Sequence, residues 1–410
     1  MANSFFKKFA PLFVIAIVLS VAIFIPGCQK ELQIITTPQE TEISNLGQSG
    51  NFFKAQPDLR VPDSYIVVFK EDVTDVDAKV GRLTAMANGK AVFTYKHAIK
   101  GFSIKVPEAA IKKIMNDPSI AYIEEDQIVQ LSATQTNATW GIDRVDQRDL
   151  PLSTTYVYNY TGSGVHVYII DTGIRYTHTE FGGRAVFGFD AFGGDGSDKN
   201  GHGTHVAGTT GGVTYGIAKS VRLYSVRVLD ASGSGTVSGI IAGVDWVTNH
   251  HTTNPAVANM SLGGGASTAM DDAVKRSIAD GVTYVVAAGN SYANACNYSP
   301  ARVPEAITVG ATTSTDGFAS YSNYGSCVDI LAPGTNITSA WRNSNTATKT
   351  ISGTSMASPH VAGTAALYLQ VYPSASPASV ASAIINNSTT GKITSVPSGT
   401  PNRLLYTLFF

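Results

Sequence analysis

Near-continuous apolar runs alternate with segments of helical spacing through the C-terminal part of the chain. The runs at residues 165–170 and 284–288 are hydrophobic at almost every position, which is typical of parallel strands covered on both faces. Segments with a helical repeat, at residues 236–249 and 270–280, lie between such runs. For residues 133–410 the pattern therefore predicts an α/β fold, with a mainly parallel sheet flanked by helices.

A smaller pattern of short strands and helices precedes this region, between residues 64 and 132. Apolar or alternating stretches predict strands at residues 65–69, 101–106 and 120–124, with one helix ending near residue 87 and a second at 111–115. These elements predict a small α+β domain. Because the segment has no Cys and no cluster of Asp, His and Ser, we expect no chemistry of its own from it.

The N-terminus has the layout of a secretory signal, predicted here as residues 1–28. Two lysines precede an apolar run from residue 9 to 25, and Pro26, Gly27 and Cys28 follow it. A retained membrane anchor is the alternative, although a run of about 17 residues is at the short end for a membrane span.

The end of this segment also resembles the lipobox of bacterial lipoproteins, in which a Gly precedes a Cys that carries lipid. Gly27 and Cys28 fit that pattern, and Pro26 departs from it. The following residues, 29–63, are polar and turn-rich without sustained periodicity, which predicts a linker.

Composition narrows the class of partner. The chain of 410 residues has 29 basic and 30 acidic residues, a formal net charge of -1, so it lacks the basic footprint of a nucleic-acid-binding protein. We expect no nucleic-acid partner. The three cysteines, Cys28, Cys296 and Cys327, show no CxxC spacing, and an oxidising compartment would leave the last two free to pair.

Three segments rich in small residues each carry one reactive side chain. Asp171 ends a predicted buried strand, at the edge where open α/β sheets place their functional groups. His202 and Ser355 each lie at a predicted junction between a loop and a helix. A serine hydroxyl becomes a nucleophile when an imidazole accepts its proton, and that imidazole needs a carboxylate to orient it. The order Asp, His, Ser is that of subtilisin.

Other interpretations of these motifs fit less well. Asp171-Thr172-Gly173 alone would also begin an aspartic protease half-site, but only one such motif is present. An α/β-hydrolase would place its catalytic His well after the Ser, and only His360 follows Ser355. His205 has no Glu or Cys at ligand spacing, so we expect a packing role for it and for His360 rather than a metal site.

These three segments resemble the Asp, His and Ser signatures of the subtilisin family, and the wider pattern from about residue 140 to 405 resembles its proteinase K and aqualysin branch. Residues 64–132 resemble the prosegment of these enzymes, a folding chaperone and inhibitor. The resemblance implies a secreted serine endopeptidase made as an autoprocessed zymogen, cleaved near Leu131, Ser132 or Ala133, that acts on proteins and peptides as a monomer.

Roles follow residue by residue from the resemblance. Asp171 would orient His202, His202 would act as general base and then general acid, and Ser355 would form the acyl-enzyme. Asn290 matches the family's oxyanion donor, acting with the backbone N–H of Ser355. The alternative is that Asn290 only ends a strand at a turn.

An extended substrate would pair with two enzyme strands in this family. The matching residues that would bind substrate are Ser261, Leu262 and Gly263 on one strand, Gly233 and Gly235 on the other, and Ala287 and Gly289 beside the S1 pocket. No acidic residue occurs in these segments, so we expect broad cleavage after apolar or aromatic residues.

The resemblance also implies stabilising features. Cys296 and Cys327 match a disulfide of the aqualysin-like enzymes, with two buried thiols as the alternative, whereas Lys199 and Ala231 replace the cysteines of a second one. Structural calcium, with no catalytic cofactor, would be held at two sites. The first comprises Asp329 with the carbonyls of Pro304 and Ala306, and the second comprises Asp143, Asp146 and Gln147, for which a solvated helix surface is an equal alternative.

A protein that kept this fold only as a binding or scaffold module is the rival of a different class. Such a module has no physical need for an intact Asp171, His202 and Ser355 together with Asn290. We therefore favour the enzyme.

Overall fold

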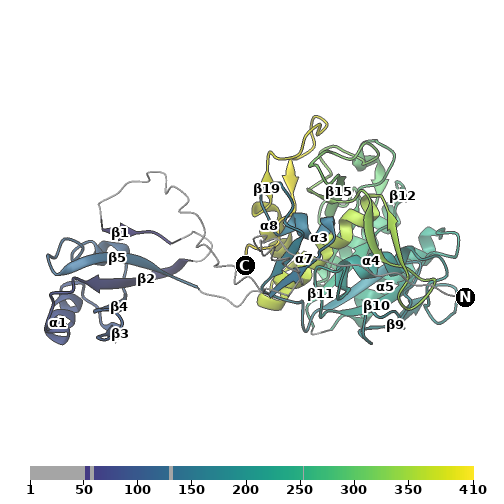
Figure 1. The fold of residues 1–410 in the computed structure, drawn as a ribbon. Helices are drawn as coiled ribbons and strands as arrows, with labels where there is room; N and C mark the ends of the chain where they lie inside the picture. The colour runs from purple at the N-terminus through teal and green to yellow at the C-terminus, as the bar shows by residue number, and fades with distance from the viewer. Residues whose placement is uncertain (1–50, 56–59, 129–132, 253) are drawn as a thin grey trace, which may run out of the picture.

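The computed structural model describes residues 51–55, 60–128, 133–252 and 254–410 (Figure 1). The predicted export signal and Cys28 lie outside the described residues, as do most of the predicted linker and Leu131 and Ser132 at the predicted cleavage site. No helix in the described part of the chain combines the length and hydrophobicity needed to cross a membrane.

The described part of residues 133–410 contains a nine-stranded sheet that is parallel except for one edge pair. Parallel pairing follows from the near-continuous apolar runs, and the α/β prediction is confirmed. In spatial order the strands are β19 (Thr389–Thr390), β20 (Arg403–Leu404), β16 (Ile330–Pro333), β15 (Ile307–Thr312), β13 (Thr283–Ala287), β11 (Ala256–Met260), β8 (His166–Asp171), β10 (Arg222–Arg227) and β9 (Ala185–Asp190).

Helices cover both faces of this sheet. Successive side chains of β8 alternate between the faces: Val167 and Ile169 join the core beneath α4 and α7, and Tyr168 and Ile170 join the core beneath α5 and α6. Both cores are buried, which is why the central strands are mostly apolar. The helices are α3 (Trp140–Val145), α4 (His202–Gly211), α5 (Val237–His250), α6 (Thr268–Ala279), α7 (Thr354–Val371) and α8 (Pro377–Asn386), with a 3-10 turn η1 (Ala295–Asn297).

Three short antiparallel pairs surround the sheet. The hydrophobic pattern does not predict these strands, because two to four residues are too few to show a periodicity. They pair β6 (Ala133–Thr136) with β7 (Thr155–Tyr158), β12 (Gly264–Gly265) with β14 (Tyr298–Ser299), and β17 (Ile337–Ala340) with β18 (Thr348–Ile351).

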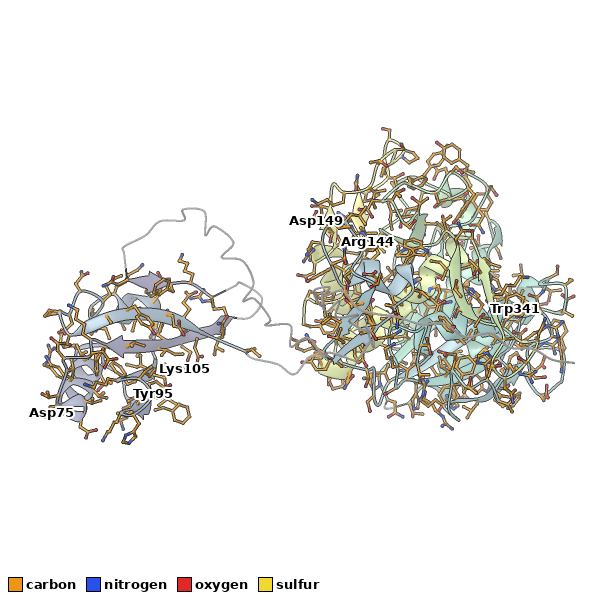
Figure 2. The ribbon with its side chains drawn as sticks, viewed as in Figure 1. Asp75, Tyr95, Lys105, Arg144, Asp149 and Trp341 are labelled. Carbon is orange, nitrogen blue, oxygen red and sulfur yellow. A yellow bond between two sulfur atoms is a disulfide. The ribbon has the colours of Figure 1, made fainter. Side chains whose placement is uncertain are left out.

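A buried ion pair fastens the first helix of this domain. Arg144 in α3, labelled in Figure 2, is fully buried and donates from Nε and Nη2 to the two carboxylate oxygens of Asp316 at 2.7 and 2.9 Å. Nη1 and Nη2 also donate to the carbonyls of Gln147 and Arg148, respectively. Because each of the three guanidinium nitrogens has a partner, the buried charge is compensated and α3 is held against the loop after β15.

The described residues between 51 and 128 form a five-stranded sheet with two helices packed on it, as predicted for a small α+β domain. The spatial order is β1 (Phe52–Phe53), β5 (Ile120–Gln127), β2 (Arg60–Phe69), β4 (Gly101–Lys105) and β3 (Ala91–Tyr95), with α1 (Val76–Met86) and α2 (Glu108–Ile111).

Two details of this smaller domain differ from expectation. The helix predicted at 111–115 is wrong: α2 ends at Ile111 and turns occupy 112–116, just before Pro118, which disfavours helix in the residue preceding it. Strand β2 begins at Arg60 and β1 pairs in parallel with β5, so the domain extends into the segment predicted as linker.

Candidate active site

The carboxylate of Asp171 and the imidazole of His202 are in direct contact. Asp171 is the last residue of β8 and is fully buried, and His202 is the first residue of α4. Nδ1 of His202 lies 2.8 Å from one carboxylate oxygen of Asp171 and 2.9 Å from the other. An ionised carboxylate only accepts, so Nδ1 carries the proton and Nε2 is left as the free base.

The electrostatics of His202 favour its charged form. Burial lowers the pKa of the imidazole, but the charge and hydrogen bond of Asp171, together with the charge of Asp198, outweigh burial and raise the pKa above its usual value. The site is therefore built to stabilise an imidazolium.

Ser355 is the second residue of α7, so the prediction of a loop-to-helix junction at this serine is confirmed. Its hydroxyl donates to the carbonyl of Ser261 at 3.0 Å. The hydrogen bonds among the described residues do not include one between Ser355 and His202, so the hydroxyl must turn from Ser261 to reach the imidazole. Catalytic hydrogen bonds are often long or poorly aligned in free enzymes and tighten when substrate binds.

Asn290 follows β13 and lines a cavity of about 240 Å³ together with Ser355. Its side-chain oxygen accepts hydrogen bonds from the backbone N–H and the hydroxyl of Thr354, at 2.8 and 2.9 Å. The oxygen end of the amide is therefore engaged, and its NH₂ end is the part available to a bound group.

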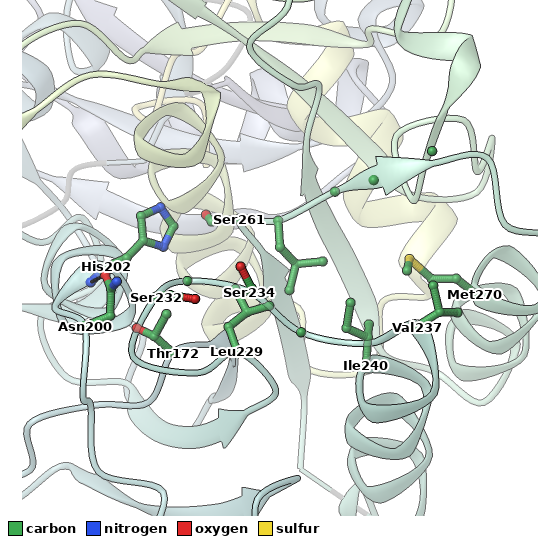
Figure 3. Close-up of a pocket in the computed structure, with 16 residues that line it drawn as sticks. Thr172, Asn200, His202, Leu229, Ser232, Ser234, Val237, Ile240, Ser261 and Met270 are labelled. Carbon is green, nitrogen blue, oxygen red and sulfur yellow. Dashed lines mark hydrogen bonds between the residues drawn. The ribbon is translucent and has the colours of Figure 1, made fainter.

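A larger cavity of about 570 Å³ opens beside His202 (Figure 3). The segment 262–265 lines both cavities, and the residues predicted to bind substrate lie in their walls. Ser261, Leu262, Gly263, Gly233 and Gly235 line the larger one, and Ala287 and Gly289 line the smaller one.

One side of the larger cavity is apolar, and the sequence did not predict which residues form it. It is formed by Leu229, by Val237 and Ile240 at the start of α5, and by Met270 in α6 (Figure 3). These are single residues at helix starts and strand ends, where no motif marks them. The only signal was the apolar periodicity of the two helices, which equally predicts core.

The two other histidines near the motifs are buried packing residues, as predicted. Nε2 of His205 lies 3.0 Å from the carbonyl of Ile337, and Nδ1 of His360 lies 2.8 Å from that of Met356. Burial lowers the pKa of His205 to about 3 and that of His360 to about 4, so both are neutral.

Cys296 and Cys327 form a disulfide, with Cα atoms 5.3 Å apart, which confirms the predicted pairing. It joins the 3-10 turn after Asn290 to the loop before β16. At Lys199 and Ala231, which we expected to leave no second disulfide, the neighbouring Asn200 donates from its side chain to the carbonyl of Ala231 at 3.0 Å and bridges the two loops.

Asp329, predicted as a metal ligand, lies beside the strand that follows Pro304 and Ala306. Its Oδ2 accepts from the N–H of Thr308 at 2.8 Å. Burial raises the pKa of Asp329 to about 6, against the opposing effects of that N–H and of Arg403. The carboxylate is thus short of positive partners.

The second predicted set is gathered at the end of α3. Both oxygens of Asp143 accept hydrogen bonds from Ser153 and Thr154, and Asp146 accepts from the N–H of Val157. The side-chain amide of Gln147 donates to the carbonyls of Asp149 and Pro151. Among the described residues, no three His, Cys, Asp or Glu side chains cluster as a metal site.

Two regions of the chain are similar to known proteins. Residues 162–403 match the family model described as "Subtilase family", and residues 64–132 match "Peptidase inhibitor I9". The chain is 53% identical over 371 residues to the extracellular serine proteinase of Thermus sp. (strain Rt41A), covering 85% of this chain and 90% of that protein. It is 50% identical over 372 residues to the alkaline serine exoprotease A of Vibrio alginolyticus, covering 86% and 69%. The crystal structure of a cold adapted subtilisin-like serine proteinase matches with a TM-score of 0.65 and 55% identity, covering 67% of this chain and 99% of that one.

Proposed function

This chain belongs to the subtilase family and is a secreted serine endopeptidase made as a zymogen, and from that premise we propose that Asp171, His202 and Ser355 are its catalytic residues. Subtilases need no catalytic cofactor. The single observation that supports this assignment most is the direct contact between His202 Nδ1 and both oxygens of the buried Asp171.

The chemistry proceeds in two halves. Nε2 of His202 takes the proton of the Ser355 hydroxyl as Oγ attacks the scissile carbonyl, and the imidazolium then donates that proton to the leaving amine. Water deacylates the enzyme by the same groups in reverse. Asp171 keeps the imidazole in the required tautomer and stabilises its charge.

The tetrahedral oxyanion would be held by the side-chain NH₂ of Asn290 and the backbone N–H of Ser355. The engaged oxygen of Asn290 supports this role, because it leaves the NH₂ end of the amide to donate to a group bound in the cavity that Asn290 and Ser355 both line. Removing one such donor costs on the order of 10²–10³ in kcat.

Substrate would bind as an extended strand between the segments 232–235 and 261–264, the walls of the larger cavity. The smaller cavity, bounded by Ala287, Ala288 and Gly289, would take the P1 side chain. No Asp or Glu lines either cavity, which supports apolar or aromatic P1 residues rather than Lys or Arg. Sequencing the products of a peptide library tests this: a majority of cuts after Lys or Arg would contradict it.

The inhibitor domain, predicted as residues 64–132, would be removed by cleavage near Leu131, Ser132 or Ala133, leaving 133–410 as the mature enzyme. Ala133 is the first residue of β6, and β6 pairs along its length with β7, which supports a boundary just before it. We expect the mature enzyme to act as a monomer on proteins and peptides, without a nucleic-acid partner.

Residues 1–28 would direct export of the precursor. The segment predicted as a linker, residues 29–63, would connect them to the inhibitor domain, which already includes β1 and the start of β2. Lipid at Cys28, if the Gly27-Cys28 pair is a lipobox, would tether the precursor until cleavage beyond residue 130 releases the enzyme. Intact-mass measurement of the activated protein tests this: mature enzyme still joined to a lipidated Cys28 would contradict it.

Structural calcium is proposed at two places, where oxygen ligands suit this ion. At the first, Asp329 would act with the carbonyls of Pro304 and Ala306, and its raised pKa fits a carboxylate that lacks a cation. At the second, Asp143, Asp146 and Gln147 would supply the oxygen ligands. Burial and the charge of Asp143 raise the pKa of Asp146 to about 7, so a cation between these two carboxylates would be stabilised. Calcium would hold loops together and take no part in the reaction.

The test of the catalytic assignment is Ser355→Ala. The parent precursor is expected to shorten on activation and to react covalently with a fluorophosphonate, whereas Ser355→Ala stays full-length and unreactive. Ser374→Ala, at an exposed serine just beyond α7, serves as the control for a Ser-to-Ala substitution. A Ser355→Ala chain that still reacts would refute the assignment.

A further inference from the structure

A second buried carboxylate lies behind the contact between Asp171 and His202, and no role in the proposed mechanism uses it. Asp198 is in the loop before α4, four residues ahead of His202, and is only 7% exposed. A buried carboxylate is costly unless its oxygens are hydrogen-bonded, so its partners reveal what it organises.

One oxygen of Asp198 fixes the loop that leads into the catalytic histidine. Oδ1 accepts from the backbone N–H groups of Asn200 and Gly201, at 2.9 and 2.8 Å. It also accepts from the hydroxyl of Thr172 at 2.9 Å, and Thr172 directly follows Asp171. The carboxylate thereby ties the residue beside one catalytic group to the residues beside the other.

The other oxygen fixes the first turn of the helix that His202 begins. Oδ2 accepts from the backbone N–H of Thr204 at 3.0 Å and from its hydroxyl at 2.5 Å. Thr172 adds a further connection, because its hydroxyl accepts from the N–H of Gly203 at 2.9 Å. His202 is therefore held on both sides by groups bound to one carboxylate.

All five bonds to Asp198 come from neutral donors, three backbone N–H groups and two hydroxyls. No Lys or Arg in the described part of the chain forms an ion pair with it, so its negative charge acts on its surroundings. The nearby titratable groups that face His202 are Asp171 on β8, Asp198 itself, and the neutral His205 one turn along α4.

We propose that Asp198 is a positioning residue of the catalytic centre: its carboxylate fixes the backbone on both sides of His202 and adds a second negative charge that supports the imidazolium formed during peptide hydrolysis. This role rests on the proposed function of His202 as the general base. Asp198 touches no substrate, since it lines neither of the two cavities.

The variant Asp198→Asn keeps the size and shape of the side chain but removes its charge and one of its two acceptor oxygens. Its side-chain oxygen can still accept from Thr172, Asn200 and Gly201, but its NH₂ replaces the acceptor of the Thr204 N–H, and the negative charge is lost. We expect kcat to fall on the order of 10- to 100-fold through misplacement of the base, with little change in KM. We also expect the acid limb of kcat/KM to move to lower pH, because the imidazolium loses support.

Asp195→Asn is the matched control. Asp195 lies in the same loop but is exposed, with its carboxylate bound to Ser197, so its removal should leave the acid limb in place. Titration of the His202 ring by NMR, in the full-length precursor carrying Ser355→Ala, measures the same shift without requiring activity. Equal His202 titration and equal acid limbs for parent and Asp198→Asn would overturn the proposal.

If Asp198→Asn does not fold, the variants Thr204→Val and Thr204→Ser test whether Asp198 positions His202. Thr204 is fully buried, and only the Val variant loses the hydroxyl bond to Asp198. Thr204→Val should have a lower kcat than Thr204→Ser with the same acid limb, because the charge remains; equal kcat values would refute positioning. Asp171→Asn tests the proposed catalytic triad separately from the proposed role of Asp198. Intact activity in Asp171→Asn would refute the triad, whatever the result for Asp198→Asn.

Discussion

The side-chain oxygen of Asn290 is held by Thr354 through two hydrogen bonds, one from the backbone N–H at 2.8 Å and one from the hydroxyl at 2.9 Å. Thr354 is the residue before Ser355 and begins α7. The group that orients the proposed oxyanion donor is therefore one residue from the proposed nucleophile. Thr354 and Ser355 both lie on the first turn of α7, so the orientation of the Asn290 amide relative to Ser355 is fixed before substrate binds. Preorganised electrostatic stabilisation requires such a fixed arrangement.

Asn290→Leu should lower kcat on the order of 10²–10³-fold with a small change in KM, because the lost hydrogen bond forms to the oxyanion and not to the ground-state carbonyl. Steady-state kinetics on a peptide substrate measures both constants. Thr354→Ser keeps both donors to Asn290 and should resemble the parent, whereas Thr354→Val should lose part of kcat. A parent-like kcat for Asn290→Leu would contradict the assignment.

The pH dependence of activity should reflect Asp171. His202 acts as a base only when neutral, and its raised pKa places the acid limb of kcat/KM above the usual histidine value. Asp171→Asn removes the charge that supports the imidazolium, so the acid limb should move to lower pH while kcat falls on the order of 10⁴-fold. An unchanged acid limb in a folded Asp171→Asn enzyme would show that Asp171 does not govern His202.

Much of this site could be predicted from the sequence because the functional residues lie at ends of regular elements. The apolar run that becomes β8 ends at Asp171, and parallel strands present their carboxyl ends at one edge. The small residues around His202 and Ser355 marked the starts of α4 and α7, and both helices begin within one residue of the expected position.

Outside the catalytic motifs and the disulfide, the sequence did not indicate which distant residues are in contact. Nothing local shows that Arg144 pairs with Asp316, 172 positions away, or that Asp198 binds Thr172. An isolated Asp in a loop is more often a turn residue, so its burial appears only after tertiary packing. The apolar wall of the larger cavity was missed because Val237 and Ile240 follow the same periodicity as core residues.

The disulfide should stabilise the mature domain. Cys296 and Cys327 close a loop with a sequence separation of 31, for which the chain-entropy account gives about 3.7 kcal/mol. We expect Cys296→Ser/Cys327→Ser to unfold at lower urea concentration than its parent, both in the Ser355→Ala background to prevent autolysis. Ser326→Ala, next to Cys327, should leave the midpoint unchanged. Equal midpoints for the double variant and its parent would contradict a stabilising role.

Chelation should destabilise the enzyme through the proposed calcium sites. Calcium held at about 100 times its Kd would add about 2.7 kcal/mol to the free energy of unfolding, so EGTA should lower Tm in the Ser355→Ala background. Asp329→Asn should reduce the response to EGTA, whereas Asp280→Asn, at an exposed carboxylate, should keep it. A Tm that EGTA does not change in the parent would argue against bound calcium.

Acid should weaken the fold through the two buried neutral histidines. The pKa of His360 is lowered to about 4 and that of His205 to about 3, whereas in the unfolded chain each would titrate near 6.5. Between pH 6.5 and 4 the unfolded state thus binds more protons than the native state, and the free energy of unfolding falls as pH decreases, by up to about 1.4 kcal/mol per pH unit for each histidine. In urea titrations of the Ser355→Ala precursor, His360→Gln should reduce this slope by about one proton. An identical slope with and without His360 would show that this histidine is not the group that titrates on unfolding.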